Sequence, residues 1–148
     1  MDSTKKRFAV LLSSTILVAG LIAAGFQFSA IFAATTKTDN GSVNVSVDWS
    51  PKELQQGKAA QFTINFQDPA SGMLLKHVNY NLEVKDANGN TIKSLMGLHT
   101  HTGNDAQTIT FNKAGNLQLV ITVLGLGLSM PFDTTKSGTA ETPLVVVP

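Results

Sequence analysis

Apolar and polar residues alternate along most of the chain after residue 42, and this alternation limits the fold more than any other feature. In Val43–Trp49, three valines and a tryptophan occupy every second position, with polar residues between them. A period of two puts alternate side chains on opposite faces of a β-strand, which predicts strands buried on one side. No segment after residue 34 shows the period of an amphipathic helix. The fold class is therefore expected to be all-β.

Seven alternating segments are separated by turn-forming sequences rich in Gly, Asn, Asp and Pro. Their regular spacing predicts a seven-stranded, immunoglobulin-like antiparallel β-sandwich over residues 43–148, with a small barrel as the alternative. The predicted strands are Val43–Trp49, Phe62–Gln67, Val78–Lys85, Ile92–Leu98, Thr108–Phe111, Leu117–Val123 and Thr142–Val147.

The N-terminal part of the chain has a different character. Residues 8–34 carry no charge and follow Lys5, Lys6 and Arg7. This pattern predicts a signal peptide over residues 1–34. Because about 20 apolar residues can span a bilayer, an uncleaved hydrophobic helix that anchors the chain is the alternative. Either reading places the remaining chain outside the cytoplasm, secreted or membrane-anchored, with residues 35–42 as a polar linker.

Composition excludes several classes of function. The 11 basic and 10 acidic residues nearly balance, which argues against a nucleic-acid partner. The chain has no cysteine, so thiol catalysis, disulfides and thiolate metal sites are excluded. Neither G-x-S-x-G nor H-E-x-x-H occurs, and we expect the protein not to be an enzyme. Two glycosylation motifs, at Asn40 and Asn44, fit an exported chain.

The three histidines lie on either side of one predicted hairpin. A three-residue loop at 87–89, with Gly89 in the left-handed conformation, fixes the register of the two strands. That register pairs His77 with His99 and puts His101 opposite Leu75, on the same outer face. The apolar pairs it predicts are Val84 with Ile92, Tyr80 with Met96, and Val78 with Leu98.

Cross-strand neighbours lie about 5 Å apart, so His77, His99 and His101 are predicted to converge on one metal ion. With no thiolate available, imidazole ligands favour copper, with zinc as the alternative. Asp105 is a candidate oxygen ligand. A thioether could come from Met73, Met96 or Met130, although core packing is the expected role of the methionines and the register points Met96 inward. Histidines without a metal, on an ordinary polar face, are the competing interpretation.

Several segments also resemble a known group of domains. The sequences LLKHVNYNLEV and HTHTG, followed by ITFNKAGNLQLVITV, lie within the stretch Trp49–Pro148. This stretch resembles the immunoglobulin-like domains of archaeal secreted and cell-surface proteins, related to YtkA/FixH-like β-sandwiches. The resemblance implies a β-sandwich fold and a location outside the cytoplasm.

These observations give two expectations for function. The first is an extracytoplasmic module that binds a transition metal through His77, His99 and His101, as a carrier or accessory domain. The second is a non-catalytic structural or partner-binding subunit of a membrane or cell-surface assembly. Its partner would be a membrane or envelope protein, reached through strand edges and loops.

Overall fold

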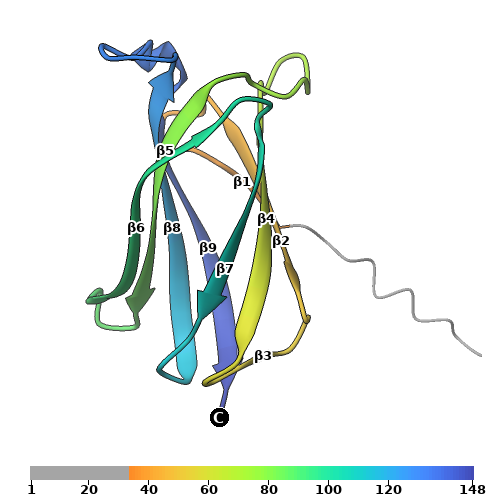
Figure 1. The fold of residues 1–148 in the computed structure, drawn as a ribbon, viewed down its shortest axis with the longest axis vertical. Helices are drawn as coiled ribbons and strands as arrows, with labels where there is room; N and C mark the ends of the chain where they lie inside the picture. The colour runs from red at the N-terminus through yellow and green to blue at the C-terminus, as the bar shows by residue number, and fades with distance from the viewer. Residues whose placement is uncertain (1–33) are drawn as a thin grey trace, which may run out of the picture.

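The computed structural model describes residues 34–148, in which two β-sheets pack face to face (Figure 1). The predicted leader lies outside the described residues, apart from Ala34. Within the described part, the one helix is a short 3₁₀ turn, η1 (Thr134–Lys136). Among the described residues, no helix has the length and apolar character needed to cross a membrane. The two-sheet, all-β prediction is confirmed.

The spatial order of the strands follows their order along the chain in the first sheet but differs from it in the second. The first sheet, in spatial order, contains β1 (Ala34–Lys37), β2 (Asn44–Ser50), β4 (Ala59–Gln67) and β7 (Asn104–Thr110). The second contains β3 (Leu54–Gln55), β9 (Gly138–Val147), β8 (Gly115–Leu126), β5 (Val78–Asp86) and β6 (Thr91–Thr100). Neighbouring strands are antiparallel except β3 and β9.

Over residues 34–148, nine strands therefore replace the seven that the alternation predicted. The first addition, β1, begins at the last residue of the predicted leader and covers the first three residues of the predicted linker, where it pairs with β2. Three of its four residues are polar, and four residues are too few to show a period. The second, β3, has only two residues, and it pairs in parallel with β9. Strands this short carry no periodic signal, so sequence patterning could not find them.

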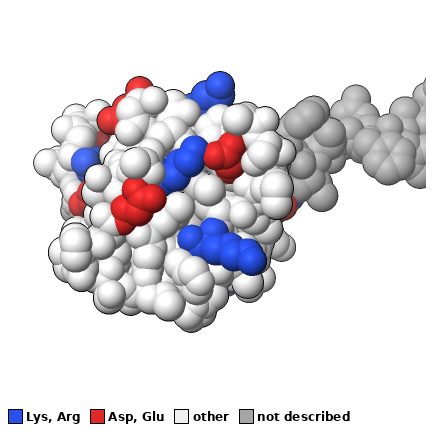
Figure 2. All heavy atoms as spheres, turned by 90° about the horizontal axis from the view of Figure 1, so that it is seen from above, with Lys and Arg blue, Asp and Glu red and all other residues white. Residues whose placement is uncertain are grey.

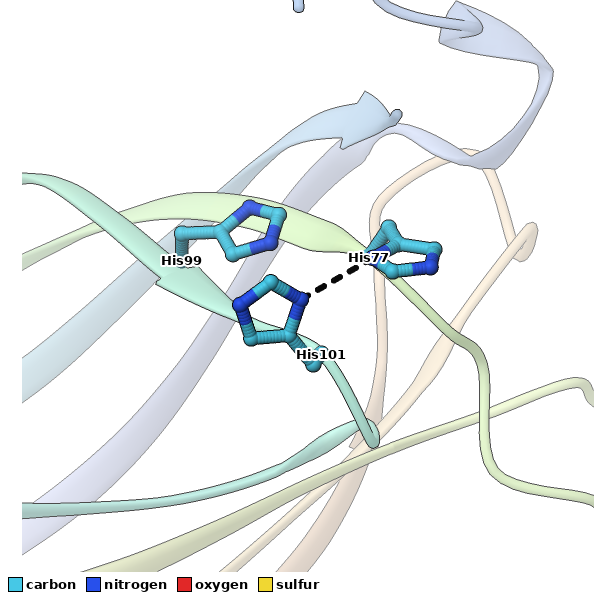
Figure 3. A group of neighbouring side chains, drawn as sticks. All are labelled: His77, His99 and His101. Atoms are coloured by element: carbon cyan, nitrogen blue, oxygen red, sulfur yellow. Dashed lines mark hydrogen bonds between the residues drawn. The ribbon is translucent and has the colours of Figure 1, made fainter. Parts of the chain in front are cut away.

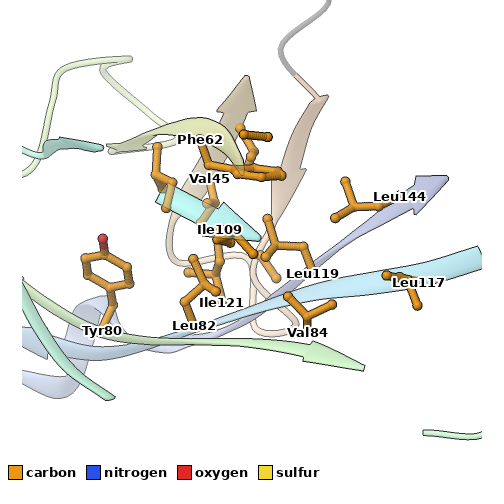
Figure 4. Close-up of a cluster of buried hydrophobic side chains, with 14 of the residues drawn as sticks. Val45, Phe62, Tyr80, Leu82, Val84, Ile109, Leu117, Leu119, Ile121 and Leu144 are labelled. Atoms are coloured by element: carbon orange, nitrogen blue, oxygen red, sulfur yellow. The ribbon is translucent and has the colours of Figure 1, made fainter. Parts of the chain in front are cut away.

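The core forms from the inward rows of the two sheets (Figure 4). From β4, Phe62, Ile64 and Phe66 are fully buried, and β5 contributes four fully buried side chains, Val78, Tyr80, Leu82 and Val84. These rows match the alternation in the sequence. Burial of this apolar surface is the main force that holds the two sheets together.

The β5–β6 hairpin begins as predicted and then departs from the predicted register. At the turn, the Asp86 N–H donates to the Asn90 carbonyl at 2.9 Å, and Gly89 has a φ of 83°. Farther along, two irregularities each add one residue to β6, so that the pairs become Val84–Lys93, Tyr80–Leu98 and Val78–Thr100. Extra residues of this kind are β-bulges.

The bulges correct the predicted place of Met96, whose side chain is 62% exposed rather than in the core. Leu95 packs against the core instead, opposite Leu82. At the second bulge, the Gly97 N–H donates to Oδ1 of Asn81 at 2.8 Å, which satisfies a donor near the point where the register shifts. Since two extra residues are an even number, the residues after this bulge return to the face that the sequence predicted.

Adjacent valines on β9 give a matched test of this packing. Val146 is 2% exposed and Val145 is 64% exposed. We expect Val146→Ala to lower the free energy of unfolding by about 1.5–3 kcal/mol, because it removes buried methyl groups and leaves a cavity. Val145→Ala should change it by less than about 0.5 kcal/mol. Urea unfolding of both variants measures the difference, and equal losses would contradict the assigned facing of β9.

Candidate metal centre

The three histidines gather where β5 begins and β6 ends (Figure 3). His99 lies within β6, His101 directly follows it, and His77 directly precedes β5. One ring nitrogen from each residue lies within 4.8 Å of the others. His77 and His99 are half-buried, whereas His101 is exposed. The predicted cluster is therefore brought together by the fold.

The pairing that creates the cluster differs from the predicted one. His99 is paired with Asn79, not with His77. The His77 N–H donates to the carbonyl of His101 at 3.3 Å, so His101 faces His77 rather than Leu75. The two bulges in β6 cause this shift of two positions. All three side chains nevertheless share the outer face, because an even shift preserves facing.

The spacing of the rings suits a single ion after a small adjustment. Nδ1 of His77 and Nδ1 of His101 are 3.3 Å apart. Two nitrogens bound to one tetrahedral ion at about 2.0 Å lie about 3.3 Å apart. The ring centroids of His99 and His101 are 4.7 Å apart, and those of His77 and His99 are 5.9 Å apart. The three ring nitrogens lie within 4.8 Å of one another, so the side chains must move closer together to share one ion.

His77 has an unusual backbone conformation. Its φ is 54°, and it is the one non-glycine residue with positive φ among residues 34–148. This left-handed conformation costs on the order of 1 kcal/mol for a residue with a Cβ. Neighbouring contacts hold it in place, since the Gly127 N–H donates to the His77 carbonyl at 2.8 Å. The strain lies at a position whose side chain belongs to the cluster.

His99 has one ring nitrogen engaged and one free. Its Nδ1 lies 2.8 Å from Oδ1 of Asn79, while Nε2 is buried and has no hydrogen-bond partner among residues 34–148. Burial lowers the pKa of His99 below 6.5, and the nearby His101 and His77 lower it further, while Asp105 opposes them. A neutral imidazole with a free nitrogen is the form that binds metal ions.

Asp105 does not join the cluster. Its Oδ2 accepts hydrogen bonds from the Tyr80 hydroxyl at 2.7 Å and from Nε2 of Gln107 at 3.1 Å. Burial and the Asp105 carboxylate raise the pKa of Tyr80, which keeps this hydroxyl protonated as a donor. The predicted oxygen ligand is therefore committed to a contact with the core tyrosine.

The methionines are also placed differently from the prediction that they fill the core. Met73 and Met130 are 70% and 79% exposed, on the loops that precede β5 and follow β8. Leu74 and Leu128 are exposed on the same loops. Nζ of Lys136 bonds Oδ2 of Asp68 at 2.6 Å and joins the two loops. Apolar side chains thus lie on both loops beside the histidines.

Asn79 is the residue of the site that sequence analysis missed. It is a buried polar side chain on the outer face of β5 and contacts His99 directly. In the sequence it is one of several polar residues alternating with the apolar row of β5. Asn79 could have been identified by its position opposite His99, but predicting that pair requires knowing where the bulges are.

The acid–base behaviour of His99 can be measured directly. We expect its imidazole to titrate below pH 6.5, because the charged ring is poorly solvated and is repelled by its neighbours. A His101→Gln variant should raise the pKa of His99 only part of the way back to 6.5, since burial, which the substitution leaves in place, is the larger cause of the lowering. Ring-proton chemical shifts followed against pH give both values. A wild-type pKa at or above 6.5 would contradict the described environment.

The fold has relatives among solved structures, although the sequence matches no protein-family model and no curated protein sequence. The PmoD soluble domain from Methylocystis sp. ATCC 49242 (Rockwell) is similar with a TM-score of 0.54 at 11% identity, covering 76% of this chain and 97% of that domain.

Two further structures are more distant. The PKD domain of an M14-like peptidase from Thermoplasmatales archaeon SCGC AB-540-F20 has a TM-score of 0.42 at 11% identity, covering 78% of this chain and 99% of that chain. A β-glucuronidase from Parabacteroides merdae has a TM-score of 0.41 at 14% identity, over 71% of this chain and 13% of that enzyme. At these identities the PmoD likeness shows a shared β-sandwich fold, and the relation to YtkA/FixH-like domains stays a prediction.

Proposed function

We propose that this protein is an extracytoplasmic β-sandwich module that binds one transition-metal ion through His77, His99 and His101. Copper is the proposed ion, with zinc as the alternative, and the role is that of a carrier or accessory domain. The observation that carries the proposal is the convergence of three imidazole nitrogens within 4.8 Å, one of them buried and without a partner. A buried polar atom left unpaired is costly unless it serves a ligand.

The donor set favours copper or zinc. The chain contains no cysteine, and no carboxylate belongs to the cluster among the described residues. Neutral imidazole suits copper and zinc, whereas magnesium and calcium prefer oxygen ligands. Three protein ligands leave one coordination position open, as in many sites that exchange a ligand.

The three ligands would contribute differently. His99 is fixed by its bond to Asn79, and His77 is fixed through its backbone. The ring of His101 is exposed, and its contact with Nδ1 of His77, 3.3 Å away, would give way as the ring turns toward an ion. Two fixed ligands and one adjustable ligand suit an ion that must be taken up and released, which is why a carrier role is proposed.

The surface around the site does not suggest a polyanion as the ligand. The end of the sandwich seen in Figure 2 is mostly uncharged, with basic and acidic side chains interspersed. The location outside the cytoplasm rests on the charge-free segment after Lys5, Lys6 and Arg7. A metal module in an oxidising compartment would also have reason to use imidazoles rather than thiolates.

A partner-binding role is the second candidate, and the exposed loops beside the histidines favour it. Met73, Leu128 and Met130 are each at least 70% exposed. Long apolar side chains grouped on adjoining loops are a common feature of protein interfaces. In this role the protein would be a subunit that contacts a membrane or envelope protein, and it would be indifferent to metal.

Metal titration followed by calorimetry separates the two candidates. We expect wild-type protein to bind one Cu(II) or Zn(II) per chain. His99→Ala and His101→Ala should each weaken binding by at least about 100-fold, since even residues outside the ligand set are worth about 10–100-fold. Binding should also weaken as the pH falls toward 5, because protons compete for the imidazoles.

Asp105→Asn is the matched control, because it changes the nearest acidic candidate without removing an imidazole. Its affinity should stay within a few-fold of the wild type, and circular dichroism should show that every variant is folded. If the wild type and the histidine variants bind metal equally weakly, the metal proposal is wrong and the partner-binding role remains.

A further inference from the structure

The orientation of the Asn79 side chain is decided by the groups around it. Its amide nitrogen lies 2.8 Å from the Gly127 carbonyl oxygen, 3.3 Å from that of His77 and 3.4 Å from that of Gly125. Carbonyl oxygens accept hydrogen bonds and cannot donate them. The amide nitrogen must therefore face these three oxygens, and the amide oxygen must face His99.

This orientation determines the proton on His99. Oδ1 of Asn79 can only accept, and it lies 2.8 Å from Nδ1 of His99. Nδ1 must therefore carry the proton, and in a neutral ring the lone pair is then on Nε2. That is the nitrogen that is buried without a partner. The contacts of one asparagine thus select which nitrogen of His99 is free.

We propose that Asn79 is the positioning residue of the metal centre. By accepting the hydrogen bond from Nδ1, it leaves Nε2 of His99 free to bind the ion, and its own orientation depends in part on the loop after β8. The proposal rests on the proposed function. In proteins, a bond to the second ring nitrogen of a histidine ligand fixes its tautomer and increases its affinity for the metal. Asn79 would not touch the ion itself.

The loop after β8 contributes one of the three carbonyl groups that hold Asn79, that of Gly127, while Gly125 lies within β8. Leu126 and Asp133 close this loop with two backbone hydrogen bonds of 3.0 and 2.8 Å. Gly125 has a φ of 141°, and a Cβ there would lie 2.6 Å from the Asp133 carbonyl oxygen. The close approach of Asp133 needs glycine at this position, and the two backbone bonds fix the start of the loop, next to the Gly127 carbonyl.

A purely structural role for Asn79 is the competing explanation, because its amide also satisfies carbonyls near the surface. Asn81 offers a matched comparison. It lies two residues along β5 on the same face, and its Oδ1 accepts the Gly97 N–H at 2.8 Å without contacting a histidine. Asn79→Ala and Asn81→Ala each remove one side-chain amide from the same face of the same strand.

Nitrogen chemical shifts of the histidine rings in metal-free protein test the tautomer. We expect wild-type His99 to be protonated at Nδ1, Asn81→Ala to leave it so, and Asn79→Ala to lose this preference. Zn(II) affinity should fall by about 10–100-fold in Asn79→Ala and stay nearly unchanged in Asn81→Ala.

A wild-type His99 protonated at Nε2 would overturn the proposal, whether or not metal binds and whether or not Asn79→Ala folds. Unchanged Zn(II) affinity in an Asn79→Ala variant that has lost the tautomer would overturn it as well. If wild-type protein binds no metal but has the expected tautomer, the proposed function fails while the control of His99 by Asn79 stands.

Discussion

The inward row of β5 is the constraint on which the rest of the structure depends. Its four side chains are fully buried in the strand that lies between β8 and β6. Each such side chain contributes about 1.5–3 kcal/mol by leaving water, so rotating the strand would be prohibitive. Because successive residues of a strand point to opposite faces, this burial also fixes the outward row, in which Asn79 and Asn81 lie. The histidine cluster uses a geometry that the core has already determined.

Two energetically unfavourable features of the structure lie in the histidine cluster. His77 occupies a left-handed conformation, and the buried Nε2 of His99 has no partner in the part of the chain that the structure describes. Either feature alone could be an accident of packing. Together, within one cluster of three imidazoles, they fit the general observation that strained and unsatisfied groups concentrate at functional sites. The sandwich can sustain these costs because its core lies elsewhere, between the sheets.

Much of this arrangement was predictable from sequence, and the failures have physical causes. Alternation predicted the two-sheet fold and the inward rows of β4 and β5, because burial on one face leaves a period of two. It also predicted that the three histidines share a face. The bulges in β6 could not be predicted, since an extra residue leaves no signature in a short alternating run. The exposed Met96 and the pairing of His99 with Asn79 both follow from those bulges.

The paired bulges also limit how the hairpin can change length over evolutionary time. One additional residue between Thr91 and Leu98, added without a bulge to absorb it, would reverse the facing of everything after it. His99 and His101 would then point into the core, and Leu98 would point into water. Two additional residues would restore the facing, as the existing two do. A change in the length of this strand therefore keeps the histidines on the outer face only where the number of added residues is even or a further bulge absorbs the odd one.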